Sequence, residues 1–176
     1  MTDPESRTET RIETSRLIAA PAAAIFALLC DPQGHLAIDS SGMLQGFEGE
    51  PVSAAGDSFR IHMDRESLND YPEMGTYDVT VTIRDFECDR LISWSILGRV
   101  RPQIGHVYGY RLECVTEPGD ESVTASNSTL VTSFYDWSHI HPDWAAMGIF
   151  PVLSENALRG TLGILDRTVR RGYVRT

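Results

Sequence analysis

The chain has 176 residues, a length typical of one domain. Hydrophobic residues make up 41% of it and charged residues 23%, which excludes wholesale disorder, collagen and fibrous classes. The formal net charge is −10, and all fifteen cationic side chains are arginine, so the acidic balance argues against nucleic acid as a partner.

The first predicted elements are a strand and two short helices. Residues 11–20 are rich in β-branched side chains and end at Pro21, which suits the first turn of a helix. Apolar residues at helical spacing predict that helix over 22–30, and the Asp31-Pro32 pair ends it. A second short helix is predicted from Gln33 to Ile38.

Between Met43 and Tyr135 the apolar pattern changes to a period of two. Six strands are predicted, over 43–51, 57–65, 75–88, 90–98, 105–115 and 121–135, several of them separated by turn residues. Their alternation gives one apolar and one polar face, as in an antiparallel sheet that is buried on one side. With the first strand, the sheet has seven strands.

The last element is a long helix. Apolar residues recur with a period of 3.6 from Phe150 to Val169, and Gly172 is a natural stop. We expect one continuous helix over 150–169, packed on the sheet face that carries Val79, Val81, Trp94 and Tyr110. A twisted sheet curved around one helix closes poorly, which predicts a cavity between them.

This order of elements resembles the helix-grip fold of the START and Bet v 1-like (SRPBCC) superfamily. The resemblance is carried by TSRLIAAPAAAIFALLCDP, by GHVYGYRLECV, and by FYDWS followed by FPVLSENALRGTLGILDRTVRR. Within the superfamily, the chain is similar to bacterial polyketide cyclase/dehydrase and lipid-transport-like proteins. The resemblance implies an α+β fold in which a curved, seven-stranded antiparallel sheet wraps around the C-terminal helix. It implies no shared catalytic motif, because members range from lipid carriers to cyclases and co-chaperones.

We expect a single helix-grip domain over residues 9–172, with a frayed or disordered N-terminus (1–8) and a short C-terminal tail (173–176). Cys30, Cys88 and Cys114 lie in apolar contexts without zinc-site spacing, which predicts reduced core residues. There is no signal-peptide pattern and no apolar run approaching about 18 residues. These features predict a cytoplasmic protein without a membrane span, as a monomer or homodimer.

The candidate ligand-binding residues follow from the predicted cavity. Inward strand positions with large apolar or amphipathic side chains, and the inward positions of the last helix, are expected to line it. They are Phe59, Ile61, Tyr77, Val79, Val81, Trp94, Tyr108, Tyr110, Leu153, Ala157 and Thr161.

The histidines are the other candidates. His139 and His141, flanked by Asp136 and Asp143, have metal-ligand chemistry, but a polar loop before a helix explains the same residues, and we expect neither metal nor cofactor. By strand parity, His62 lies on the polar face of the sheet with Arg60 and Asp64. We expect His106 to be exposed and His35 to lie either at the cavity rim or on the surface.

The leading functional hypothesis is the binding of a small hydrophobic molecule, such as a lipid, an aromatic polyketide or an isoprenoid, between the sheet and the last helix. One alternative is a metal-free cyclase or dehydratase, in which a cavity Tyr or His acts as general acid or base. A second alternative is a protein-interaction module that uses an open sheet edge or the 66–74 loop.

Overall fold

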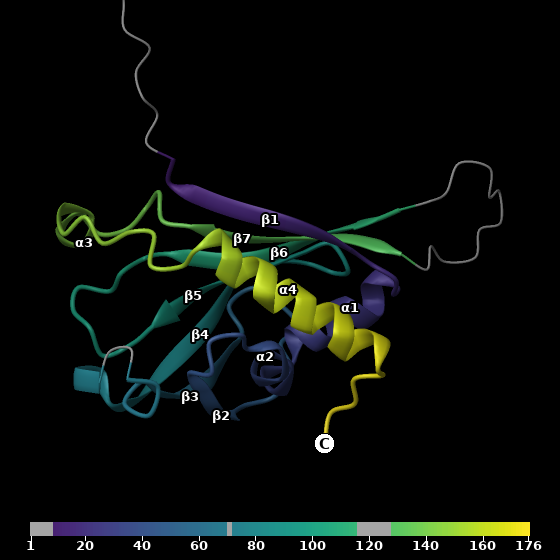
Figure 1. The fold of residues 1–176 in the computed structure, drawn as a ribbon, viewed down its shortest axis with the longest axis horizontal. Helices are drawn as coiled ribbons and strands as arrows, with labels where there is room; N and C mark the ends of the chain where they lie inside the picture. Colours follow the sequence, from purple (N-terminus) through teal and green to yellow (C-terminus); the bar gives the residue numbers. More distant parts are fainter. Residues whose placement is uncertain (1–8, 70–71, 116–127) are drawn as a thin grey trace, which may run out of the picture.

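Seven strands form one antiparallel sheet in the order β1-β7-β6-β5-β4-β3-β2 (Figure 1). The structure is a computed structural model that describes residues 9–69, 72–115 and 128–176. The strands in this part of the chain are β1 (Arg11–Ile18), β2 (Leu44–Glu48), β3 (Ser58–Asp64), β4 (Thr76–Glu87), β5 (Leu91–Leu97), β6 (Val107–Cys114) and β7 (Thr129–Asp136).

The helices are α1 (Ala22–Cys30), α2 (Pro32–Ile38), α3 (Pro142–Ala146) and α4 (Glu155–Arg170), with a short 3-10 turn, η1 (Pro72–Met74). Asp31 separates α1 from α2, and its carboxylate accepts a hydrogen bond of 3.0 Å from the Gln33 N–H. The α+β helix-grip architecture predicted from the sequence is therefore confirmed, with two short helices after the first strand.

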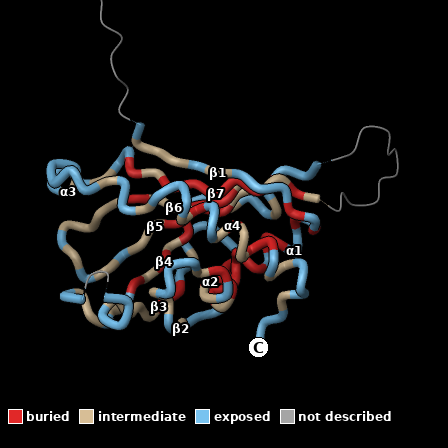
Figure 2. The backbone as a smooth tube through the Cα atoms, viewed as in Figure 1, coloured by how far each residue is buried: buried red, intermediate tan, exposed pale blue. Residues whose placement is uncertain are grey.

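The strand parity predicted from the alternation is also confirmed. Val79, Val81 and Ile83 of β4 are buried on one face of the sheet, and Trp94 of β5 is only 8% exposed. These residues belong to the main core, which lies between the sheet and the layer formed by α1, α2 and α4 (Figure 2). A register shifted by one residue would have put Trp94 in solvent.

The predicted start of the last helix is wrong. Helix α4 begins at Glu155 rather than Phe150, because the side chain of Ser154 accepts a hydrogen bond from the Ala157 N–H and caps the helix. Pro151 precedes this cap by three residues and has no N–H for a helical hydrogen bond.

The predicted contact of that helix also needs correction. Helix α4 packs chiefly on β1, β7 and α2. Trp94 and Phe59 are contacted by His35 of α2 instead, with ring centroids 4.8 and 5.0 Å apart. The short helix α2 therefore covers the part of the sheet around Trp94 and Phe59, where the sequence predicts the long helix.

Two of the three cysteines are not core residues. Cys30 is buried at the end of α1, whereas Cys88 and Cys114 are exposed, Cys88 beside the turn after β4 and Cys114 at the last position of β6. Strand β7 begins at Thr129; positions 121–127 of the predicted strand, and the terminus 1–8, lie outside the described residues. No helix in the described ranges is long and apolar enough to cross a membrane.

Candidate functional site

A row of aromatic rings crosses the buried face of the sheet. Trp94 of β5 stacks with Tyr108 of β6 at 6.4 Å between ring centroids, and Tyr108 lies 4.8 Å from Tyr135 of β7. Tyr135 stacks in turn with Trp137 at 5.3 Å. The row follows from strand order, because Trp94 pairs with Tyr108 and Tyr108 with Tyr135 across neighbouring strands.

His35 closes one end of this row. Its Nε2 donates a hydrogen bond of 2.9 Å to the Leu29 carbonyl, which fixes the ring against Trp94. Burial lowers the pKa of His35 to about 4, so the ring is neutral at pH 7. The sequence predicts His35 either at the cavity rim or on the surface, whereas in the structure its side chain is buried.

His106 lies beside the row, and its predicted exposure is wrong. The side chain is buried, and its Nδ1 is 3.0 Å from the Tyr135 hydroxyl. Its ring also meets Tyr108 edge-on, with the centroids 5.0 Å apart. Burial lowers the pKa of His106 to about 4. Tyr135, which sequence reasoning did not select, alternates with Val131 and Ser133, and this parity could have placed it inside.

The tyrosine hydroxyls of the row differ in their partners. Tyr110 hydrogen-bonds to Ser133, and burial raises the pKa of its phenol to about 12. The Tyr135 hydroxyl hydrogen-bonds to His106 and accepts a hydrogen bond from the Val152 N–H. For the half-buried Tyr108, the described residues provide no hydrogen-bond partner, and burial raises its pKa as well.

The residues predicted to line a cavity fall into three groups. Phe59, Ile61, Val79, Val81, Trp94 and Tyr110 are buried in the main core, and Tyr77 and Tyr108 are partly buried against it. Leu153 packs with Tyr135 and Trp137 in a smaller second cluster. The third group, Ala157 and Thr161, lies on α4 beside Ser40, whose hydroxyl is 2.8 Å from that of Thr161. Their role in binding remains a prediction.

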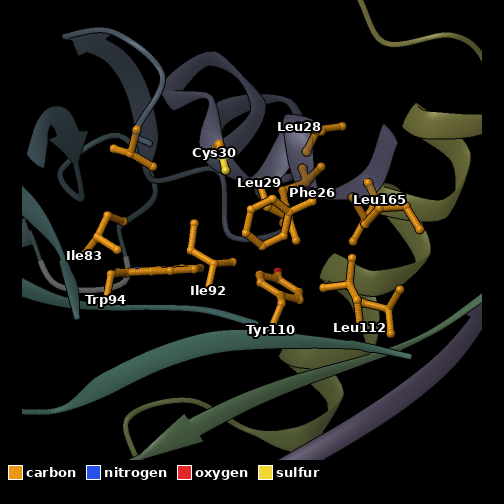
Figure 3. Close-up of a cluster of buried hydrophobic side chains, with 14 of the residues drawn as sticks. Phe26, Leu28, Leu29, Cys30, Ile83, Ile92, Trp94, Tyr110, Leu112 and Leu165 are labelled. Carbon is orange, nitrogen blue, oxygen red and sulfur yellow. The ribbon is translucent and has the colours of Figure 1, made fainter. Parts of the chain in front are cut away.

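Side chains from the helices fill the core around Tyr110 and Leu112. Phe26 and Leu29 of α1 lie over Tyr110, and Leu165 of α4 lies beside Leu112 (Figure 3). Trp94 lies on the opposite side of Ile92 from Leu112, beside Ile83 and within the same buried core (Figure 3).

Two surface pockets lie away from the centre of this core. One, of about 640 Å³, is at the end of β3 and the start of β4 and is lined by Gln45, His62, Met63, Asp64, Thr76, Tyr77 and Asp78. The other, of about 370 Å³, crosses the outer face of the sheet, and its lining includes Arg11, Arg84, Arg111 and Phe134. Of the predicted ligand-binding residues, Tyr77 lines the first pocket and none lines the second.

The remaining histidines make local contacts. His139 Nδ1 is 2.8 Å from the Ser138 hydroxyl, and His141 Nδ1 accepts the Asp143 N–H at the start of α3. His62 is on the solvent face, as predicted, with Nδ1 2.7 Å from Asp78. Across the described ranges, no three metal-ligating side chains gather closely enough to hold an ion.

Comparison with known proteins gives one weak sequence relative. No known family model matches the chain. An uncharacterized protein of Mycobacterium tuberculosis is 27% identical over 107 residues, which is 60% of this chain. That match spans 42% of the relative's length.

Solved structures give broader matches. DR_A0006 from Deinococcus radiodurans has a TM-score of 0.58 at 17% identity, covering 93% of this chain and all of that one. The Aha1 dimer from Colwellia psychrerythraea has a TM-score of 0.57 at 17% identity, over 94% of this chain and 100% of that chain. Norcoclaurine synthase from Thalictrum flavum, solved with dopamine and hydroxybenzaldehyde, has a TM-score of 0.59 at 14% identity, over 94% and 88% of the two chains. The chain therefore has the helix-grip fold of the Bet v 1-like proteins.

Proposed function

We propose that the chain binds one small, largely apolar molecule with an aromatic or conjugated ring against Trp94 and Tyr108. The observation that carries this proposal is the Tyr108 phenol, which is half-buried and has no hydrogen-bond partner among the described residues. It lies in a row of aromatic rings, between Trp94 and Tyr135.

The physical chemistry of this row suits such a ligand. Aromatic faces offer large apolar area, and ring pairs contribute about 0.5–1.5 kcal/mol beyond the burial of area. Apolar ligand area removed from water contributes roughly 25 cal/mol per Å². Tyr108 would fix the orientation of the ligand through one hydrogen bond, and Tyr77, at the start of β4, would lie at the entrance.

A structural neighbour supports the class of ligand. Norcoclaurine synthase was solved with dopamine and hydroxybenzaldehyde, which are both small aromatic molecules. By analogy of fold, an aromatic polyketide fits the row of rings better than a saturated lipid or isoprenoid, because flat rings stack on Trp94 and Tyr108.

The cyclase or dehydratase alternative has less support. Its best acid–base candidate is His106, which hydrogen-bonds to Tyr135. General bases work best when their pKa is near the working pH, and burial holds the pKa of His106 at about 4. A neutral imidazole of such low basicity suits the positioning of Tyr135 better than proton abstraction.

The test is a titration with a naphthol, monitored by tryptophan emission, to which Trp94 contributes along with Trp137 and Trp144. We expect saturation at one ligand per chain and a change in emission. Tyr108→Ala should weaken binding by at least about tenfold, because it removes a stacked ring worth more than about 1.4 kcal/mol. Tyr108→Phe should weaken it by roughly two- to tenfold, through the loss of one hydrogen bond.

Tyr173→Phe is the matched control. Tyr173 lies near the C-terminus, hydrogen-bonds to Asp31 and is not part of the aromatic row. It should leave the affinity unchanged. The proposal fails if the wild type shows no saturable binding, or if Tyr108→Ala binds as tightly as the wild type.

A further inference from the structure

The segment between β7 and α4 exposes a cluster of large apolar side chains. Met147 is 58% exposed, Ile149 48% and Val152 49%. Eight large apolar side chains are exposed in the described residues, and these three fall within six consecutive positions. The segment carries α3 and lies at the end of the sheet away from the C-terminus (Figures 1 and 2). Exposed apolar patches of this kind mark interaction sites.

This segment is anchored to the loop between β5 and β6. The Trp144 Nε1–H donates a hydrogen bond of 2.8 Å to the Pro102 carbonyl. The His141 N–H donates one of 2.9 Å to the Ile104 carbonyl. The two segments, 98–105 and 141–152, therefore form one continuous surface, which we call the α3 surface.

The charge of the α3 surface differs from that of the rest of the molecule. Arg99 hydrogen-bonds to the Met74 carbonyl, and its guanidinium lies over the Tyr77 ring, 5.6 Å from the centroid. Arg101 hydrogen-bonds to the Gly98 and Val100 carbonyls, and within the described ranges neither arginine has a carboxylate partner. Asp143 is the one acidic residue in the two segments, although the whole chain carries a net charge of −10. The surface therefore combines apolar side chains with uncompensated cations.

We propose that the α3 surface docks on an anionic lipid membrane. Met147, Ile149 and Val152 enter the boundary between headgroups and acyl chains, while Arg99 and Arg101 lie near lipid phosphates. The acidic remainder of the molecule is repelled by such a membrane, which orients this end toward it. This inference does not depend on the proposed ligand.

The experiment measures sedimentation with two kinds of vesicle, phosphatidylcholine alone and phosphatidylcholine with about 30% phosphatidylglycerol. At low salt we expect at least about tenfold tighter binding to the anionic vesicles, falling as salt screens the charges. The double variant Met147→Asp/Ile149→Asp should lose binding at least about tenfold. Arg101→Glu should weaken binding to anionic vesicles only.

Matched controls lie outside the α3 surface. Val174→Asp changes a side chain that is 72% exposed near the C-terminus, and Arg171→Glu changes an exposed cation at the end of α4. Both should bind vesicles like the wild type. The proposal is overturned if the wild type binds neither vesicle, if the Met147/Ile149 variant binds normally, or if these controls lose binding equally.

Tryptophan emission gives an independent readout. Trp94 and Trp137 are buried, whereas Trp144 is half-buried beside Met147. Anionic vesicles should shift the emission to the blue in the wild type and leave it unshifted in Trp144→Phe. If Met147→Asp/Ile149→Asp instead abolishes self-association of the chain in the absence of lipid, the surface is a dimer interface and the membrane proposal is wrong.

Discussion

The hydroxyl of Tyr173 donates a hydrogen bond of 2.9 Å to Oδ2 of Asp31, which joins the end of the chain to the turn between α1 and α2. Asp31 is only 3% exposed, and its other oxygen caps α2. Arg175 adds an ion pair with Glu50 at 2.6 Å. These contacts hold residues 173–176 against the helices that cover the core.

We expect Tyr173→Phe to lower the free energy of unfolding by about 1–2 kcal/mol, because the buried carboxylate loses a donor. Urea unfolding measures this change. Tyr77→Phe is the matched control, since Tyr77 is half-buried and no hydrogen bond of its hydroxyl is found in the described part of the chain. Equal effects of the two variants would show that the contact with Asp31 does not stabilise the fold.

Gly109 of β6 allows a close approach of Phe134 from β7. A Cβ at this position would lie 2.4 Å from the Phe134 ring and 2.8 Å from the Ile92 carbonyl oxygen. We therefore expect Gly109→Ala to destabilise the protein by about 1–3 kcal/mol through overpacking, as measured by thermal or urea unfolding.

Gly163 provides the opposite case. It lies inside α4, and nothing lies within 4 Å of an added Cβ. Gly163→Ala should therefore stabilise the protein by about 0.5–1 kcal/mol, because alanine loses less backbone entropy in a helix. If the two substitutions change stability in the same direction, the local packing described for Gly109 or Gly163 is wrong.

The sequence predicted the fold better than the site, for a physical reason. Alternation along β4 and β5 places Trp94 inside, because a side-chain period of two leaves only two choices of face. The same parity predicted that Tyr108 and Tyr110 share a face, as they do in the core.

The site depends on contacts between distant segments, which periodicity does not encode. The pairing of His106 with Tyr135 joins residues 29 positions apart through the β6–β7 register. His35 reaches Trp94 from a short helix whose placement depends on the Asp31 cap. The start of α4 was missed for a different reason, because the apolar stripe continues through Pro151 while the Ser154 cap sets the boundary.

The three cysteines should react at two rates. Cys88 and Cys114 are exposed, whereas Cys30 is buried and burial raises the pKa of its thiol to about 12. Because the thiolate is the reactive form, Ellman's reagent should modify two thiols rapidly in the native protein and the third only after unfolding. Cys30→Ser should abolish the slow phase and leave the fast one intact. Rapid reaction of all three thiols would contradict the burial of Cys30.

The two buried histidines predict an acid-dependent loss of stability. Burial lowers the pKa of both His35 and His106 to about 4, from an ordinary value of 6.5. Between these values the unfolded chain binds more protons than the folded chain, so the free energy of unfolding falls as the pH decreases. The stabilising contribution is complete above about pH 6.5 and is lost progressively toward pH 4, with an upper limit of about 3 kcal/mol for each histidine.

Urea unfolding between pH 4.5 and 8 measures this slope. His106→Gln removes one titrating group, and the variant should lose roughly half of the pH dependence below pH 6.5 even if it is less stable throughout. His139→Gln is the matched control, because His139 is exposed, and it should keep the full slope. A wild-type stability that is flat between pH 4.5 and 6.5, or a slope that disappears in His139→Gln, would show that the buried rings are not the groups that titrate.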